Sequence, residues 1–433
     1  MSREVVITAL GTAGAHGCGH AALARALAAG APPPGTAVDR AAGYHRQGGS
    51  RRALLTPGAS LAPWVPPAEA RRMGPPSRLA VAAARIALAE SGLSPELLAG
   101  PGTAVVLSTA FGPTSFSEAL LRQILLDSPE SASPYLFTES VANAPAAQIA
   151  IACGARGANV TLCQREAGPL LAVGRGAAEV AAGRAERALV GAVDEMSPLL
   201  HAMLDRFGAL ARPLSRSSPA RRPPDPDGPR AATGGEAPEE ACEIARPFDR
   251  RRSGVVAGDG ATVLLLETAA AAGAGGREPL ARVRGWGSAF DPSAPPTGWG
   301  RGAEVLGRAL RRLLARRGMQ AIDRIASGAS GARAGDRLEA RVLRAAWDGA
   351  ELPPVLAPKG VTGEYGGGFL AAVVLAAAGV GGVAAAPTAG FGEPDPELGV
   401  SPHDGAPLPP PRGLLASSLA AGGAAAWLVL GRP

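Results

Sequence analysis

Lysine and asparagine are almost absent from this chain of 433 residues, although it carries a formal net charge of +6. Lys359 is the only lysine, Asn143 and Asn159 are the only asparagines, and the positive charge therefore comes from arginine. A bias that removes lysine and asparagine nearly everywhere would leave them where no substitute is tolerated. These three residues are therefore markers to compare with any motif in the chain.

Cysteine is also sparse. Cys18, Cys153, Cys163 and Cys242 lie far apart and form no CxxC pair, which fits reduced thiols better than a disulfide framework. The opening segment MSREVVITALG has no charged region followed by an apolar core, so no signal peptide is expected. These absences predict a cytoplasmic protein.

Membrane, nucleic-acid, metal and cofactor binding are not expected. The apolar run at 369–386 contains three glycines and no flanking anchors, which predicts a buried helix rather than a membrane span. The arginines are scattered and form no aromatic-interleaved basic stripe. His16, Cys18 and His20 alternate in AHGCGH but lack a fourth metal ligand. No glycine-rich stretch follows a strand as a nucleotide-binding motif requires.

Short apolar segments alternate with longer helical ones, which predicts an α/β fold with largely buried sheets. Proline, glycine and charge dominate residues 212–242, which predicts a disordered surface insertion. Two halves with similar alternation, 1–250 and 251–433, indicate a duplication. Strands are expected at 4–10, 103–109, 158–163, 187–193, 261–267 and 426–430, and helices at 76–92, 139–153 and 169–183.

Several segments together resemble the β-ketoacyl synthase family. They are VVITALGTAG near the start, GANVTL before Glu166, RPFDRRRSGVVAGDGATVLLLE at 246–267, APKGVTGEYGGG at 357–368 and LLASSLAAGGAAAWLVL at 414–430. The resemblance spans the chain outside the insertion. It implies a thiolase-like fold, in which duplicated α-β-α-β-α layered halves contain mixed five-stranded sheets.

Catalysis in that family requires a cysteine thiolate at a helix N-terminus and two histidines. Aligning the motifs places Glu166 at the cysteine position, Ser327 at the first histidine and Glu364 at the second. Ala421 stands where the family has a gating phenylalanine. The resemblance therefore implies that four functional positions are lost while the scaffold motifs remain.

The surviving markers fall on family motifs. Lys359 lies on the family's active-site lysine, and Asn159 follows the position of its Gly-Pro pair. None of the five histidines falls in either histidine motif. Cys163 precedes the nucleophile position by three residues, inside the expected strand, and is predicted to be a small buried apolar residue.

The family geometry would make Glu166 and Glu364 neighbours. Two buried carboxylates close together cannot both ionise cheaply, so the pKa of one should rise. Lys359 or Arg165 would relieve this repulsion. Lys359 is therefore expected to be structural, holding the loop that carries Glu364.

Among members of the family, the chain length factors fit this pattern. The resemblance implies a non-condensing subunit that pairs with an active ketosynthase, as a heterodimer, and handles chains bound to acyl carrier protein. Phe137, Asn143 and Ala144 would then line the interface and tunnel. Two alternatives stay open. One is an independent enzyme on a thioester or polyketide that uses Glu166 and Glu364 as an acid/base pair, and the other is a homodimeric scaffold.

Overall fold

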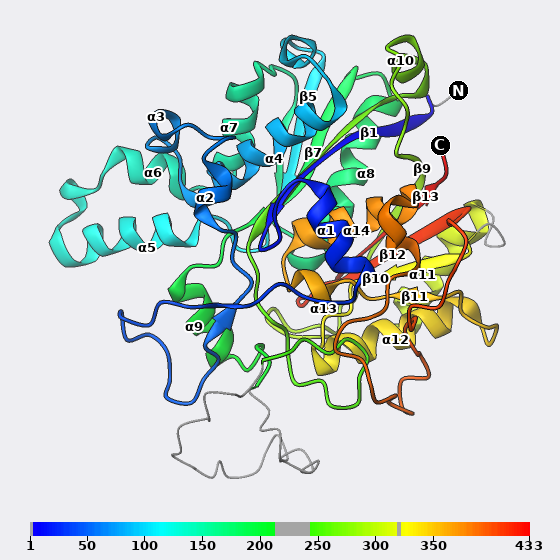
Figure 1. Ribbon diagram of the computed structural model, residues 1–433. Coiled ribbons are helices and arrows are strands. Elements are labelled where there is room, and N and C mark those ends of the chain that lie inside the picture. Colours follow the sequence, from blue (N-terminus) through cyan, green and yellow to red (C-terminus); the bar gives the residue numbers. More distant parts are fainter. Residues whose placement is uncertain (1–2, 213–242, 318–321) are drawn as a thin grey trace.

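The computed structural model describes residues 3–212, 243–317 and 322–433 (Figure 1). Apart from Arg212, the insertion expected at 212–242 lies outside the described residues, as does Cys242. Within the described ranges, no helix is long and apolar enough to cross a membrane.

Ten strands form two five-stranded halves with the same pairing pattern. The order is β6-β5-β7-β8-β1 in one half and β11-β10-β12-β13-β9 in the other. In each half the first three strands are parallel and the last two pair antiparallel. This repeated pattern is the duplication that the sequence predicts. The strands are β1 (Val5–Gly14), β5 (Thr103–Ser108), β6 (Asn159–Leu162), β7 (Arg187–Asp194), β8 (Gly260–Thr268), β9 (Ala281–Phe290), β10 (Arg324–Ser327), β11 (Val355–Leu356), β12 (Gly413–Leu419) and β13 (Ala424–Gly431).

The two halves meet where β1 pairs antiparallel with β9 over Val5–Ile7. Strand β8 follows residue 250 but lies between β1 and β7. The sequence predicts a C-terminal half that begins at residue 251. The first strand of that half, β8, therefore belongs to the sheet of the N-terminal half.

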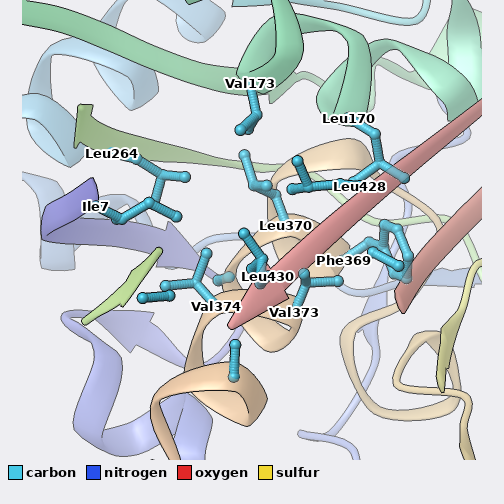
Figure 2. Packing of buried hydrophobic residues seen from close by; sticks show 14 of the residues in the cluster. Ile7, Leu170, Val173, Leu264, Phe369, Leu370, Val373, Val374, Leu428 and Leu430 are labelled. Atoms are coloured by element: carbon cyan, nitrogen blue, oxygen red, sulfur yellow. The ribbon is translucent and has the colours of Figure 1, made fainter. Parts of the chain in front are cut away.

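Two central helices, α8 (Gly168–Ala181) and α14 (Gly366–Ala378), pack between the halves. Figure 2 shows Leu170 and Val173 of α8 and Val373 of α14 among strand residues such as Ile7 and Leu428. Nearly every side chain of α14 is buried, as expected for a helix that is apolar on all sides. The run at 369–386 thus begins in a core helix that ends at Ala378. Gly379 follows it with φ 70°, and a short 3-10 helix covers Val380–Ala385.

Outer helices cover the other faces of the sheets. Helices α4 (Pro75–Ser91) and α7 (Ala144–Cys153) cover the N-terminal half, and α11 (Ala303–Arg317) and α12 (Arg333–Trp347) cover the C-terminal half. The result is the layered thiolase-like α/β arrangement. The shorter elements are α1 (His20–Ala28), β2 (Gly17–Cys18), β3 (Thr36–Ala37), β4 (Arg52–Ala53), α2 (Gly58–Leu61), α3 (Pro67–Ala70), α5 (Thr114–Arg122), α6 (Pro134–Ser140), α9 (Pro198–Arg206), α10 (Ala269–Ala274) and α13 (Lys359–Thr362).

The single helix predicted at 139–153 is wrong, because α6 ends at Ser140 and α7 begins at Ala144. Pro145 occupies the first turn of α7, where its missing N–H costs no helical hydrogen bond. The break precedes this turn, at Val141, whose backbone is extended with φ −83° and ψ 143°. The chain therefore starts a new helix there instead of continuing the old one.

Candidate functional site

Glu166 lies at the turn between β6 and α8. Strand β6 ends at Leu162, and a short 3-10 turn over Arg165–Ala167 leads directly into α8 at Gly168. Arg165 adopts a left-handed backbone with φ 46°, which reverses the chain sharply but is strained for a residue with a side chain. The Glu166 carboxylate thus lies at a helix N-terminus, where the helix dipole favours negative charge.

The second half of the chain provides the hydrogen-bond donors to Glu166. The backbone N–H of Ala421 donates to Oε2 of Glu166 at 3.2 Å, and the Ser418 hydroxyl donates to the Glu166 carbonyl oxygen at 2.6 Å. A backbone N–H pointing into a site is the kind of donor that stabilises an oxyanion. Here the Glu166 carboxylate accepts the hydrogen bond from the Ala421 N–H.

Glu364 follows α13 and is fixed by its backbone. Its N–H donates to the Val256 carbonyl at 2.8 Å. Its carboxylate accepts from Nζ of Lys359 at 2.5 Å. The Lys359 side chain is only 1% exposed, and its ammonium also lies 5.5 Å from the centre of the Phe369 ring. Lys359 therefore neutralises Glu364 inside the protein.

Glu166 and Glu364 interact, as the family geometry implies. Burial, followed by the charge of Glu364, raises the pKa of Glu166 to about 7, although Lys359 and Arg165 partly offset the rise. A carboxyl group with this pKa is about half protonated at neutral pH. The Glu166 carboxyl group is therefore partly protonated close to pH 7.

Asp194, the last residue of β7, is a third acidic group at this site that the sequence analysis missed. It accepts hydrogen bonds from the backbone N–H groups of Ala110 at 2.6 Å and Gly366 at 3.0 Å. Burial raises its pKa to about 6, despite these bonds. Its position at the end of a buried parallel strand is the signal that could have found it.

Ser327 is buried at the end of β10. Its hydroxyl donates to Glu339 at 3.1 Å and accepts from the Ala329 N–H at 3.2 Å. Burial raises the pKa of Glu339 to about 7. Asp336, one turn earlier in α12, accepts from the backbone N–H groups of Phe248, Ser330 and Gly331. The Ser327 position therefore belongs to a structural hydrogen-bond network.

The expectation that Cys163 is buried is wrong. Cys163 comes one residue after β6 ends and is exposed, because the chain leaves the sheet edge before turning into α8. Partial burial and the nearby Asp194 carboxylate raise the pKa of its thiol, so the thiol remains protonated at neutral pH.

The histidines make their contacts elsewhere in the described structure. His20 pairs with Glu90, His45 with His201 at 3.1 Å, and His403 with the Ala406 carbonyl at 2.9 Å. Burial lowers the pKa of His16 to about 4. No histidine forms a hydrogen bond with Cys163 among the residues that the structure describes. Nor does any group of three or more His, Cys, Asp or Glu residues there form a potential metal site.

The residues expected at an interface differ in exposure. Phe137 of α6 is 60% exposed, Asn143 is exposed at the start of α7, and Ala144 is buried. Asn159 donates from its side chain to the Ala146 carbonyl at 3.1 Å, which ties β6 to α7. Lys359 and Asn159 thus have specific hydrogen-bond partners, Glu364 and the Ala146 carbonyl. Among the described residues, the Asn143 side chain forms no hydrogen bond.

Tyr365 follows Glu364 and fills a slot walled by glycines. A Cβ atom on Gly14 would lie 2.4 Å from its hydroxyl, and one on Gly260 or Gly368 would lie within 2.8 Å of its ring. Tyr365 is 3% exposed, and its hydroxyl has no hydrogen-bond partner among the described residues. This ring anchors the loop that carries Glu364.

We expect Tyr365→Phe to raise the free energy of unfolding by about 1 kcal/mol, because it removes a buried hydroxyl without a partner. Urea denaturation measures the change. Tyr44→Phe is the matched control, because the Tyr44 hydroxyl donates to Glu118 and its loss should not stabilise the protein. A Tyr365→Phe variant less stable than the parent would contradict the prediction.

Comparison with known proteins places this geometry in a family. Residues 2–272 match the model of the β-ketoacyl synthase N-terminal domain. The chain is 32% identical over 331 residues to the actinorhodin polyketide putative β-ketoacyl synthase 2 of Streptomyces coelicolor, covering 75% of this chain and 74% of that protein. It is 31% identical over 330 residues to the tetracenomycin polyketide synthase ketoacyl synthase beta subunit of Streptomyces glaucescens, covering 74% and 72%.

Among solved structures, the ishigamide ketosynthase/chain length factor superposes with a TM-score of 0.83 at 26% identity over 100% of both chains. The repeated strand pattern, the turn that carries Glu166 and these similarities agree with one another. The chain therefore belongs to the β-ketoacyl synthase family.

Proposed function

We propose that this chain is a non-condensing, cytoplasmic subunit of chain length factor type. It pairs with an active ketosynthase and takes part in elongating chains bound to acyl carrier protein. The observation that carries the proposal is the position of Glu166. It stands where the family motif has the cysteine thiol, and its carboxylate accepts a hydrogen bond from the Ala421 N–H. The names of two relatives, a ketoacyl synthase beta subunit and a ketosynthase/chain length factor, support it.

The chemistry of the site opposes condensation by this chain. A carboxylate is a poor acyl acceptor, since transfer from a thioester would form a mixed anhydride far uphill in free energy. Decarboxylation of a malonyl group in this family requires two histidine imidazoles. Ser327 and Glu364 occupy the two histidine positions here, so this step is also unsupported. Buried Lys359 is held by Glu364 and is not free to act as a base.

The surface around β6 supports pairing with another chain. The large apolar side chain of Ile151, on the helix α7 that packs against β6, is 74% exposed, and that of Phe137 on the preceding helix α6 is 60% exposed. No side chain of α5 is buried, and Figure 1 shows α5 and α6 projecting from the body. Such a surface indicates a protein–protein interface. Phe137 and Asn143 would lie in it, with Ala144 beneath.

We expect the purified chain alone to form no β-ketoacyl product from acyl- and malonyl-carrier substrates. Product should form when it is co-expressed with a family ketosynthase that has an intact Cys-His-His set, and should exceed that of the ketosynthase alone. Mass spectrometry of the carrier-bound chains measures both. Condensation by this chain alone would refute the proposal.

The raised pKa of Glu166, about 7, favours one second candidate, an independent acid/base enzyme that uses Glu166 with Glu364. The variant Glu166→Gln separates the two functions. A chain length factor should still support product formation by its ketosynthase, whereas an acid/base enzyme should lose turnover on a thioester or polyketide substrate.

A further inference from the structure

The two ends of the sheet differ. Strand β11 at one end is buried, and the His403 N–H donates to its Val355 carbonyl at 2.7 Å. Strand β6 at the other end pairs only with β5 among the described strands, and its residues are exposed or half-buried. An open strand edge is a template for pairing with another strand. The exposed Ile151 lies on α7, which packs against β6.

Two arginines flank this open edge at equal distances along the chain. Arg156 precedes the first residue of β6 by three positions, and Arg165 follows the last residue by three. Arg156 is exposed and Arg165 is half-buried. Neither guanidinium has an ion pair or hydrogen bond within the part of the chain that the structure describes, although the charge of Arg165 also lowers the pKa of Glu166. The Arg165 guanidinium lies 5.7 Å from the centre of the partly exposed Phe111 ring.

Self-pairing along β6 would bring these charges together. Two copies related by a two-fold axis must pair antiparallel, so the start of one β6 lies beside the end of the other. If the two strands pair over their whole length, Asn159 of one copy lies opposite Leu162 of the other. Arg156 of each copy would then approach Arg165 of the other copy, and the contact would occur twice. Like charges across an interface disfavour association, and this effect excludes wrong partners.

We propose that Arg156 and Arg165 prevent this chain from pairing with itself and select a different chain, one with carboxylates facing both positions. The inference rests on the proposed function, because it takes the β6 edge as the interface with an active ketosynthase. The expected partner is distinguished by its negative charges. The selected ketosynthase has an acidic side chain beside each end of the strand that pairs with β6.

The symmetry makes this inference testable with single substitutions in the full chain. Arg156→Glu converts both like-charge contacts of the homodimer into opposite-charge contacts, and Arg165→Glu does the same from the other side. The double variant Arg156→Glu/Arg165→Glu restores repulsion, now between carboxylates. Arg308→Glu is the matched control, because Arg308 is exposed on α11 of the C-terminal half.

Sedimentation equilibrium at low salt measures the self-association of each variant. We expect at least about tenfold tighter homodimerisation for either single variant than for the parent, and a return to the parent level in the double variant. Added salt should reduce the gain. A tight homodimer of the parent chain, or single variants no different from Arg308→Glu, would overturn the inference.

Binding to a co-expressed ketosynthase distinguishes this result from failure of the proposed function. If Arg156→Glu homodimerises while no ketosynthase is retained by the parent chain, the charge effect stands and the proposed function fails. If the parent retains a ketosynthase but the single variants do not homodimerise, the proposed function stands and the charge effect fails.

Discussion

Lys359→Met is expected to lower the free energy of unfolding by about 3–5 kcal/mol, because it removes one partner of a buried ion pair. The ammonium of Lys359 lies 2.5 Å from Glu364 and its side chain is 1% exposed. Without it, the Glu364 carboxylate, which interacts with Glu166, has no ion-pair partner among the described residues. Methionine retains much of the side-chain volume, so the loss reports the charge rather than a cavity.

Urea denaturation at pH 8, above the pKa of about 7 of Glu166, measures this loss. The double variant Lys359→Met/Glu364→Gln is the control, because it removes both charges and should recover most of the lost stability. The ion pair is not a structural requirement if Lys359→Met stays within about 1 kcal/mol of the parent. Such a result would also remove the reason for retaining a lysine in a chain that otherwise uses arginine.

Glu166→Gln is expected to be more stable than the parent at pH 8, by on the order of 2–3 kcal/mol, and to lose this advantage near pH 5. The pKa of Glu166 rises from 4.5 to about 7 on folding, so the folded state holds the proton more tightly. This contribution to stability is fully present below pH 4.5 and is lost as the pH rises through 7. Glutamine has no proton to lose, so the variant avoids the loss.

Urea denaturation of both proteins between pH 5 and pH 8 measures this difference. The parent should become less stable as the pH rises. The variant should keep part of that slope, because burial also raises the pKa values of Asp194 and Glu339. Glu304→Gln at an exposed site on α11 should not change the slope. Identical slopes for Glu166→Gln and the parent would show that the Glu166 carboxyl does not hold its proton to neutral pH.

Much of the fold follows from local pattern and family motif. Strands β5, β7, β8 and β13 lie within two residues of the predicted ranges, because continuous apolar runs bounded by glycine and polar residues fix a buried strand locally. Helices α4 and α8 also lie within two residues of the ranges predicted at 76–92 and 169–183, and only the single helix predicted at 139–153 is wrong. The break at 141–143 depends on Pro145 and on the packing of α7 against α4, and helical periodicity alone does not encode that packing.

The residues at positions 166, 327 and 364 are a glutamate, a serine and a glutamate, so the sequence by itself determined that the positions aligned with the family motifs carry no thiol or imidazole. Only the tertiary structure decided what these side chains contact. It brings the Ala421 N–H to Glu166 across 255 positions, sets Asp194 beside the same turn, exposes Cys163 and buries Lys359. Hydrogen bonds and raised pKa values depend on burial and on neighbours distant in the chain, and neither is a property of any single segment.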